Sequence, residues 1–232
     1  MIKRARITEI FSSIQGEGPR MGERHLFIRF EGCQLRCAYC DERSKRGREM
    51  SLAAVLRRVD FWESQMGPHR FVSLTGGEPL LQSSFLGRLC RDLRRRGYRI
   101  LLETNGLLRQ EFLEVRDLCD LVAMDVKLAS VGGGKKRLAE HAAFLKYTRR
   151  GRTYIKMVIG PGIDRGDFAA HVRMVESAAP RAPIFLQPVS RRGQRWPSFA
   201  LLSRMRALRR LGKKCHPEIY LGIQLHKFLN LH

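Results

Sequence analysis

The sequence is short of acidic residues and has no long hydrophobic run. Aspartate and glutamate number 22 against 44 lysines and arginines, which gives a formal net charge of +22. Such a chain attracts polyanions and anionic small molecules. No apolar stretch reaches roughly 18 residues, so no membrane-spanning helix is predicted. The basic start "MIKRARITEI" is followed by no apolar run of about 7 to 15 residues, so we expect no signal peptide and a cytoplasmic protein.

Aromatic residues are also scarce, at 8%, and no basic stretch is interleaved with them as in a base-stacking surface. The arginines and lysines form clusters at 94–96, 149–152, 191–195 and 209–214. Each cluster lies near the end of a segment with helical periodicity, where cations suit the helix dipole. Solvated helix ends are therefore the favoured interpretation of the charge, and nucleic-acid binding stays open as an alternative.

Cysteines are few, and half of them stand alone. A chain of 232 residues can bury a core without disulfides, and cytoplasmic thiols stay reduced. We interpret the scattered Cys90, Cys119 and Cys215 as structural or free thiols. The other three form "CQLRCAYC", residues 33–40, a spacing that indicates a metal site.

The rest of the chain alternates between strand-like and helix-like patterns, with no internal repeat and no low-complexity linker. Apolar runs typical of buried strands lie at 26–30, 71–74, 99–103, 121–126, 153–159 and 183–189. Helical periodicity follows them. The first helix is predicted to begin after Ser51, a good N-cap, and the second to run from about Gln82 to Arg96 and to stop at Gly97. Others are expected near 107–118, 136–148, 166–178 and 197–211.

Six strand–helix units predict a single α/β domain over residues 1–232, built on a parallel sheet. Right-handed crossovers with helices on one side would curl this sheet into a partial barrel. A complete eight-stranded barrel typically needs about 250 residues, so the barrel should be open. A flat doubly wound sheet is the alternative. In both folds ligands bind at the carboxyl ends of the strands.

Unusual residues follow the predicted strands at these ends. Cys33 follows the first strand and "TGGEP" (75–79) the second. The next three such segments are "ETNG" (103–106), "DVK" (125–127) and "QP" (187–188). Polar and glycine-rich segments therefore gather at one rim, as an active site requires.

The cysteine loop supplies three thiolates and no nearby fourth ligand. Structural zinc usually takes four protein ligands, and no histidine follows Cys40 within about twenty residues. A cubane iron–sulfur cluster has four irons, each of which needs a ligand. Three cysteines leave one iron open, and an open coordination site suggests chemistry.

The pattern CxxxCxxC, with Tyr39 before the last cysteine, resembles the cluster loop of radical S-adenosylmethionine enzymes. "GGEP" at 76–79 strengthens the resemblance. It implies a partial (β/α)6 barrel of the radical SAM type with an open lateral face. It further implies a 4Fe-4S cluster on Cys33, Cys37 and Cys40, with the amino and carboxylate groups of S-adenosylmethionine on the open iron. Gly76 and Gly77 would allow close backbone approach, and the Glu78 carboxylate would accept from the methionine ammonium.

The segment "FSSIQGEGPRMGERHLFIRFEGCQLRCAYCDE" (11–42) resembles the start of the 7-carboxy-7-deazaguanine synthase family. The likeness continues through "LTGGEP", "LLETNG", "MDVK" and "QP" to "IQLHK". It implies a carbon–nitrogen lyase that converts 6-carboxy-5,6,7,8-tetrahydropterin to 7-carboxy-7-deazaguanine for deazapurine and queuosine biosynthesis. An adenosyl radical would abstract the hydrogen at carbon 6 before ring contraction and loss of ammonia. Magnesium, an external electron donor such as flavodoxin, and a homodimer are further implications.

The resemblance also carries over individual site residues. For S-adenosylmethionine they are Tyr39, Gly76, Gly77, Glu78, Glu103, Asn105, Asp125, Lys127 and Gln187. For the pterin they are Gln15, Glu17, Arg29, Gly77 and His226, with a substrate-capping segment at about 213–232. An amide and a carboxylate complement a 2-amino-4-oxo pyrimidine. The planar fork of Arg29 suits an anionic or carbonyl group, and this side chain should face the barrel interior or an edge.

One position departs from the family. After the last cysteine the family usually has aspartate and then threonine, whose hydroxyl helps to hold magnesium, whereas this chain has Asp41 and Glu42. Carboxylates are good ligands for hard cations, so both are candidate magnesium ligands.

Two other functions compete with this one. A radical SAM activating enzyme that acts on a protein or peptide shares the cysteine spacing and "GGEP", but not "QGEG" followed by an arginine in the first strand. A basic nucleic-acid-binding protein with a structural iron–sulfur cluster accounts for the charge, but not for the polar residues at the strand ends. Salt-dependent RNA binding would support it.

Overall fold

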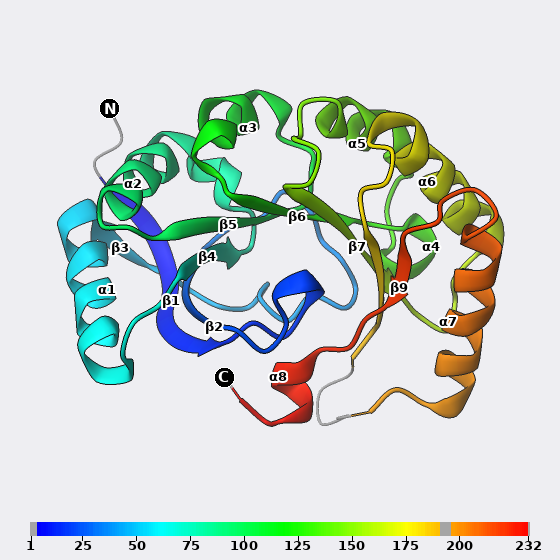
Figure 1. The fold of residues 1–232 in the computed structure, drawn as a ribbon, viewed down its shortest axis with the longest axis horizontal. Coiled ribbons are helices and arrows are strands. Elements are labelled where there is room, and N and C mark those ends of the chain that lie inside the picture. The colour runs from blue at the N-terminus through cyan, green and yellow to red at the C-terminus, as the bar shows by residue number, and fades with distance from the viewer. Residues whose placement is uncertain (1–3, 191–195, 232) are drawn as a thin grey trace.

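A curved nine-stranded sheet forms the centre of the computed structural model, which describes residues 4–190 and 196–231 (Figure 1). The basic cluster at 191–195 lies outside the described residues. The strand order is β3-β1-β2-β4-β5-β6-β7-β8-β9. The strands are β1 (Arg4–Ile14), β2 (Arg24–Phe30), β3 (Arg48–Ser51), β4 (Phe71–Gly76), β5 (Arg99–Thr104), β6 (Leu121–Val126), β7 (Thr153–Ile159), β8 (Ile184–Pro188) and β9 (Ile219–Leu221).

All six predicted strands are confirmed as neighbours in one parallel arrangement, from β2 through β4 to β8. The sequence interpretation missed the antiparallel pair β1 and β3 on one side and the short β9 on the other. Because β3 and β9 are the two ends of the strand order, the barrel is open, as expected.

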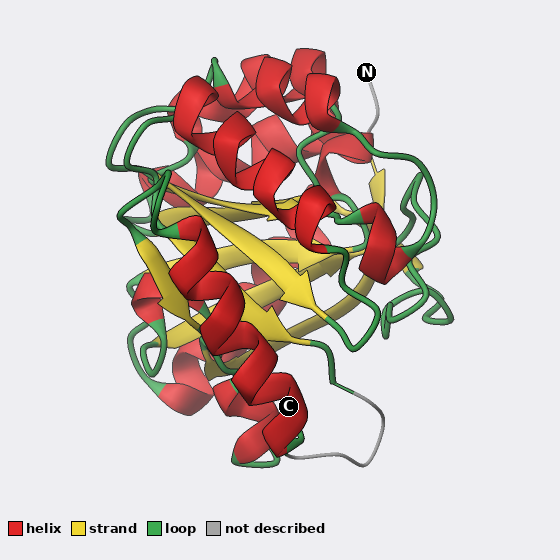
Figure 2. Ribbon diagram, turned by 90° about the vertical axis from the view of Figure 1, so that its right-hand side faces the viewer, coloured by secondary structure: helices red, strands yellow, loops and turns green. Residues whose placement is uncertain are grey.

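The longer helices cover the outer face of the sheet, as Figure 2 shows. They are α1 (Leu52–Met66), α2 (Ser83–Arg95), α3 (Arg109–Val115), α5 (Leu138–Leu145), α6 (Arg165–Ala178) and α7 (Phe199–Gly212). The short α4 (Ala129–Gly132) follows β6, and the short α8 (Leu225–Phe228) lies against the loop at Gly16. Three 3-10 turns lie at Gly18–Arg20, Pro79–Gln82 and Arg116–Leu118. The predicted N-cap is confirmed, because the Ser51 hydroxyl accepts from the backbone N–H of Ala54. Gly97, with φ at 90°, follows the end of α2 as predicted.

Successive side chains along each strand point to opposite faces of the sheet. Leu26, Ile28 and Phe30 are buried against the outer helices. The inner face carries an apolar floor of Phe71, Leu101, Ala123 and Tyr154. Two residues further along β5, β6 and β7 the same face carries Glu103, Asp125 and Lys156. Charged side chains therefore point inward at the carboxyl ends of the strands, above an apolar floor.

In the cluster at 94–96 the predicted helix-end arginines are paired with carboxylates. Arg94 and Arg95, in the last turn of α2, contact Asp120 and Asp92 at 2.7 and 2.8 Å. Arg96 forms an ion pair with Asp60. Within this cluster the positive charge is thus partly neutralised by neighbouring carboxylates.

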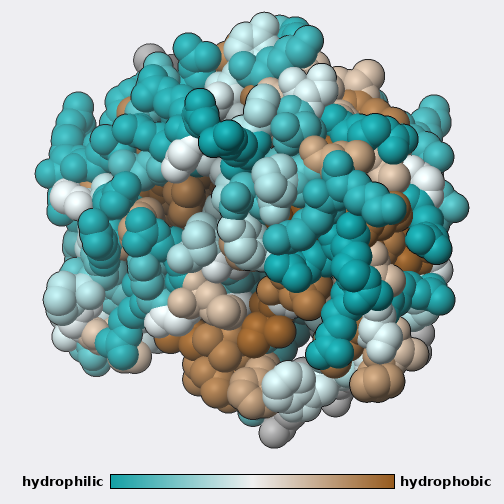
Figure 3. Space-filling view, turned by 45° about the vertical axis from the view of Figure 1, so that its right-hand side comes forward, coloured by the Kyte–Doolittle hydropathy of each residue, from teal (hydrophilic) through white to brown (hydrophobic). Residues whose placement is uncertain are grey.

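Figure 3 shows an apolar patch low on an otherwise mostly hydrophilic face. Exposed apolar residues near the C-terminal segment are Trp196, Phe199, Phe228, Leu229 and Leu231. The rings of Trp196 and Phe228 pack edge to face with centroids 4.5 Å apart.

Among the described residues no helix is long and apolar enough to cross a membrane.

Candidate active site

One cavity at the carboxyl ends of the strands brings together almost every predicted site residue. From the N-terminal and cysteine segments it is lined by Gln15, Glu17, Arg29, Cys33, Cys37, Tyr39, Cys40, Asp41 and Glu42. From the strand ends and the C-terminus it is lined by Gly76, Gly77, Glu103, Asn105, Asp125, Lys127, Gln187 and His226. Residues up to 211 positions apart in the sequence therefore share one space, which an isolated motif match cannot show.

The cysteine loop lines this cavity in turns and bends rather than in a helix or strand. Its backbone is tied to α4 by the Ala38 N–H, which donates to the carbonyl of Gly132 at 3.0 Å. The Asn105 amide lies 3.7 Å from the Cys33 sulfur and exchanges hydrogen bonds with Gln34. The loop is thus connected to α4 and to the residue that follows β5.

The donor set of the loop suits an iron–sulfur cluster. Cys33, Cys37 and Cys40 are free thiols that line the same cavity, and thiolates are the usual ligands of such clusters. Among residues 4–190 and 196–231, no three His, Cys, Asp or Glu side chains stand together at metal-binding spacing. The three thiols therefore line one cavity without converging on one point.

Two glycines allow the end of β4 to lie against the chain that leads into the cysteine loop. A Cβ at Gly76, where φ is 110°, would meet the carbonyl oxygen of Phe30 at 2.3 Å, and one at Gly77 would meet that of Gly32 at 2.0 Å. The Gly77 N–H donates to Phe30 and the Glu78 N–H to Gly32. These glycines are needed for the chain's own close backbone contact, which positions Cys33.

The Glu78 carboxylate is bound by the protein's own donors. This side chain is fully buried and does not line the cavity. Its oxygens accept hydrogen bonds from the backbone of Leu80 and Asn105 and from the Thr104 hydroxyl, at 2.7 to 3.1 Å. Glu78 therefore fixes the turn after β5, and only the backbone of its motif reaches the cavity wall.

Glu78 gives the protein a predicted pH dependence. Burial raises the pKa of Glu78 to about 7, against the opposing hydrogen bonds from Asn105 and Leu80. Between pH 4.5 and 7 the folded protein holds a proton that the unfolded chain has released. The stability from this group is therefore present below pH 4.5 and is lost as the pH rises through 7. Between pH 5 and pH 8 the free energy of unfolding of the wild type should fall by about 2 to 3 kcal/mol more than that of Glu78→Gln.

The measurement is the free energy of unfolding from urea titrations across this pH range. Glu114→Gln, at an exposed position in α3, is the matched control and should keep the wild-type slope. Parallel curves for wild type and Glu78→Gln would show that Glu78 is already ionised at low pH.

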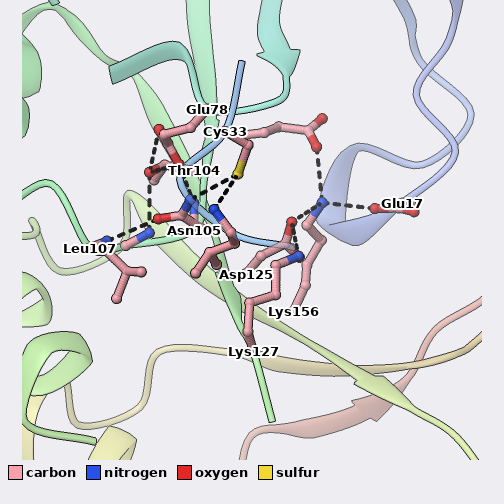
Figure 4. A network of polar contacts seen from close by, with 12 residues as sticks. Glu17, Cys33, Glu78, Thr104, Asn105, Leu107, Asp125, Lys127 and Lys156 are labelled. Atoms are coloured by element: carbon pink, nitrogen blue, oxygen red, sulfur yellow. Dashed lines mark hydrogen bonds and ion pairs between the residues drawn. The ribbon is translucent and has the colours of Figure 1, made fainter. Parts of the chain in front are cut away.

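Lys156 is the centre of the charged part of the cavity (Figure 4). Its ammonium lies 2.9 Å from both Glu17 and Glu103 and 3.6 Å from Asp125, and the residue is only 3% exposed. Burial alone would lower the pKa of Lys156, but the three carboxylates hold it well above its usual value. Burial likewise opposes ionisation of Glu17, yet the ammonium lowers the pKa of Glu17 to about 2. Glu17 is therefore charged at neutral pH.

The two residues of "QGEG" enter this network from the other side. The Gln15 amide donates to Glu103 at 3.3 Å, and its oxygen accepts from the backbone N–H of Glu17. Glu17 also accepts from the Gln224 amide at 2.7 Å. Predicted substrate residues (Gln15, Glu17) and a predicted cofactor residue (Glu103) are thus hydrogen-bonded to one another.

The C-terminal segment closes over this group. The Leu225 N–H donates to the carbonyl of Gly16 at 3.0 Å. His226 lines the cavity and lies so close to Gly16 that a Cβ there would be 1.9 Å from its Nδ1. Lys227 contacts Asp41 at 3.1 Å and Ser190 at 2.7 Å. The segment therefore joins the first loop to the cysteine loop.

Lys127, Tyr39 and Gln187 complete the wall near the cysteine loop. Lys127 lies 3.3 Å from Asp125 and 5.8 Å from the centroid of the Tyr39 ring. Gln187 is 3% exposed, and its amide nitrogen donates to no described residue. A buried amide donor that faces the cavity without a partner is suited to a ligand acceptor.

The predicted magnesium ligands are both bound to protein cations. Asp41 pairs with Lys227, and one Glu42 oxygen accepts from Arg29 at 2.7 Å and from Lys45 at 2.8 Å. The other Glu42 oxygen is buried and accepts no hydrogen bond from the described residues. Magnesium usually keeps several of its waters and is bound through one or two carboxylates, whereas both carboxylates here already face protein cations. This arrangement of carboxylates and cations does not fit that ion.

Sequence reasoning missed Lys156, Lys45 and Gln224. Lys156 gave one readable signal, because it is the single charged residue in the apolar run "TYIKMVI". Lys45 gave none, because it is one of many charged residues in "DERSKRGRE" (41–49). Gln224 gave none, because its partner Glu17 lies 207 residues away in the sequence.

Comparison with known proteins agrees with this geometry. The model of the radical SAM superfamily matches residues 27–175. A 7-carboxy-7-deazaguanine synthase from Geobacter sulfurreducens is 33% identical over 82% of this chain and 83% of its own length. One from Methanothermobacter thermautotrophicus is 31% identical over 100% of this chain and 99% of its own. The crystal structure of QueE from Escherichia coli superposes with a TM-score of 0.66 at 25% identity, covering 96% of this chain and 95% of that one.

Proposed function

Because the chain belongs to the 7-carboxy-7-deazaguanine synthase family of radical SAM enzymes, we propose that it converts 6-carboxy-5,6,7,8-tetrahydropterin to 7-carboxy-7-deazaguanine. The observation that carries this proposal is the shared cavity. The three thiols of the cysteine loop and the "QGEG" carboxylate Glu17 line the same space. A radical source and a pyrimidine-binding group are thereby held within reach of one substrate.

Cys33, Cys37 and Cys40 would hold a 4Fe-4S cluster whose fourth iron is left for S-adenosylmethionine. When bound, the cluster and S-adenosylmethionine supply a 5′-deoxyadenosyl radical. The backbone of Gly76 and Gly77 forms the wall beside Cys33. Asn105, Lys127, Gln187 and Tyr39 supply polar and aromatic contacts around that wall. We assign these residues to the cofactor.

Gln15, Glu17, Arg29 and His226 would contact the pterin. An ionised carboxylate accepts two hydrogen bonds, which matches the amino group and ring N–H of a 2-amino-4-oxo pyrimidine. Lys156 forms ion pairs with both Glu17 and Glu103 and holds both in place. The C-terminal segment, about 213–232, caps the site through its contacts with Gly16 and Glu17. Water is thereby kept from the reacting carbon.

The rest of the proposal concerns partners. The radical SAM reaction needs an external electron donor, for which flavodoxin is our candidate, and a homodimer is proposed by analogy with the family. Magnesium has no part in the proposal, because Asp41 and Glu42 are already paired with lysine and arginine.

The capping assignment predicts the effect of a single methyl group. Gly16 has no positive φ, so alanine is tolerated by the backbone, but its Cβ would overlap His226 at 1.9 Å. Gly16→Ala should push His226 and its segment away and raise KM for the pterin about tenfold or more, with normal cluster content. Steady-state kinetics of the reconstituted enzyme measures this.

Two further variants make this test specific. Gly87→Ala, where a Cβ finds ordinary contact at 3.5 Å in α2, should leave KM unchanged. Gly16→Ala combined with His226→Ala should be no worse than His226→Ala alone, because the clash is gone. A Gly16→Ala enzyme with wild-type KM would show that the segment does not close on the substrate.

The function itself is tested by anaerobic cluster reconstitution and incubation with S-adenosylmethionine, a reductant and carboxytetrahydropterin. Mass spectrometry should detect 7-carboxy-7-deazaguanine. Cofactor cleavage without this product would keep the radical SAM chemistry and favour the activating-enzyme alternative. A protein that forms no reactive cluster and binds RNA in a salt-dependent manner would favour the nucleic-acid alternative.

A further inference from the structure

Four charged side chains form a connected group at the wall of the cavity. Arg29 donates to Glu9 at 3.1 Å and to Glu42 at 2.7 Å. Lys45 lies 2.8 Å from the same Glu42 oxygen and 3.6 Å from Glu9. Two carboxylates and two cations thus neutralise one another without any metal ion.

Local structure holds this group in place. Glu9 and Arg29 are direct cross-strand neighbours on β1 and β2, just after the register shift between Ile7 and Glu9. The Arg29 guanidinium also stacks on the ring of Phe11 at 4.8 Å. Glu42 and Lys45 lie three residues apart in the loop after Cys40, whose Lys45 N–H donates to the Glu42 carbonyl. The position of each charge is therefore set by a strand pair or by a turn.

The burial of these groups shows which of them can exchange with solvent ions. The Glu42 side chain is 15% exposed, whereas Lys45 is 36% exposed. Arg29 and Glu42 line the main cavity, whereas Lys45 does not and instead lines an adjoining hollow that also contains Tyr39, Cys40 and Asp41. Lys45 thus approaches Glu42 from the solvent side and leaves Arg29 as the cation that faces the cavity.

We propose that the Lys45 ammonium takes the place of a divalent metal ion at Glu42, so that the site binds the substrate's carboxylate through Arg29 without magnesium. A doubly charged ion beside Glu42 would face two cations within a few ångströms, at only partial solvent screening. It would have to displace Lys45 to reach more than one oxygen of Glu42. This inference rests on the proposed function for the identity of the substrate, but not for the absence of the metal.

Metal binding to the cluster-loaded enzyme tests the inference apart from turnover. Mn²⁺ is the probe, because its free concentration is read directly by electron paramagnetic resonance. Wild type should bind no Mn²⁺ that depends on Glu42, and its turnover in EDTA should match that in magnesium. Lys45→Met should acquire one Mn²⁺ site and a turnover that magnesium raises about tenfold. Lys45→Arg should behave as wild type, because it keeps the charge.

Lys135→Met is the matched control, since this lysine is exposed in the loop after α4, and it should gain no site. A wild-type Mn²⁺ site that Glu42→Gln abolishes would overturn the inference, and so would a Lys45→Met enzyme that gains none. If wild type makes no deazaguanine but follows the predicted Mn²⁺ pattern, the substrate assignment fails and the metal-free site stands.

Discussion

Replacing Lys156 with methionine is expected to reduce turnover about 100-fold or more and to lower the free energy of unfolding by about 3 to 5 kcal/mol. The substitution keeps an unbranched apolar stem of about the same length, with sulfur in place of one methylene, and removes the ammonium. Glu17, Glu103 and Asp125 then face one another in a site where the lysine is 3% exposed. Their repulsion should displace the group that binds the pyrimidine and repel the anionic substrate.

A double-mutant cycle separates this charge effect from lost packing. Adding Glu17→Gln to Lys156→Met removes one uncompensated carboxylate and should restore part of the stability but not the activity. Lys146→Met, at an exposed lysine after α5, should be neutral in both measurements. A stable, active Lys156→Met enzyme would show that the three carboxylates are not held by this ammonium.

Alanine at Cys33, Cys37 or Cys40 is expected to abolish S-adenosylmethionine cleavage completely. The reason is chemical, since each iron needs its thiolate, while Cys33 and Cys40 are exposed and add little to packing. The folded protein should therefore keep its circular dichroism spectrum. It should lose the visible absorption that arises from thiolate-to-iron charge transfer in the cluster. Anaerobic reconstitution and chromatography of 5′-deoxyadenosine measure the loss.

Cys215→Ala is the control for these variants, because Cys215 is exposed and does not line the cavity. It should retain cluster and cleavage. A variant of the trio that keeps full cleavage would remove that cysteine from the ligand set. A trio variant that loses both its cluster and its fold would favour a structural cluster.

Most of the fold could be predicted from the sequence, because the central strands are buried on both faces. Such strands read as continuous apolar runs, and all six were confirmed. β1 was missed because its alternation of buried and exposed residues breaks at the register shift between Ile7 and Glu9. The buried apolar residues are at odd positions before the shift (Ala5, Ile7), whereas the next one, Ile10, is at an even position. β9 has only three residues, too few for any periodicity.

Part of the candidate site was predictable, because the position of a residue at the end of a strand determines where it lies in the fold. Residues just after consecutive parallel strands meet at one rim, and this explains why Cys33, Asn105 and Lys127 share a cavity. The direction of a single side chain was not predictable. Glu78 turns away from the cavity because the backbone N–H of Asn105, 27 residues later, offers it a buried hydrogen bond. A hydrogen bond between residues this far apart cannot be predicted from the local sequence around either of them.

The most direct test of the account follows one hydrogen atom. Carboxytetrahydropterin carrying deuterium at carbon 6 is incubated with the reconstituted enzyme, S-adenosylmethionine and a reductant. If the cavity holds the pterin beside the radical source as proposed, mass spectrometry should find deuterium in the recovered S-adenosylmethionine and 7-carboxy-7-deazaguanine as the product. Turnover of the cofactor with all the deuterium left in unreacted pterin would contradict the account.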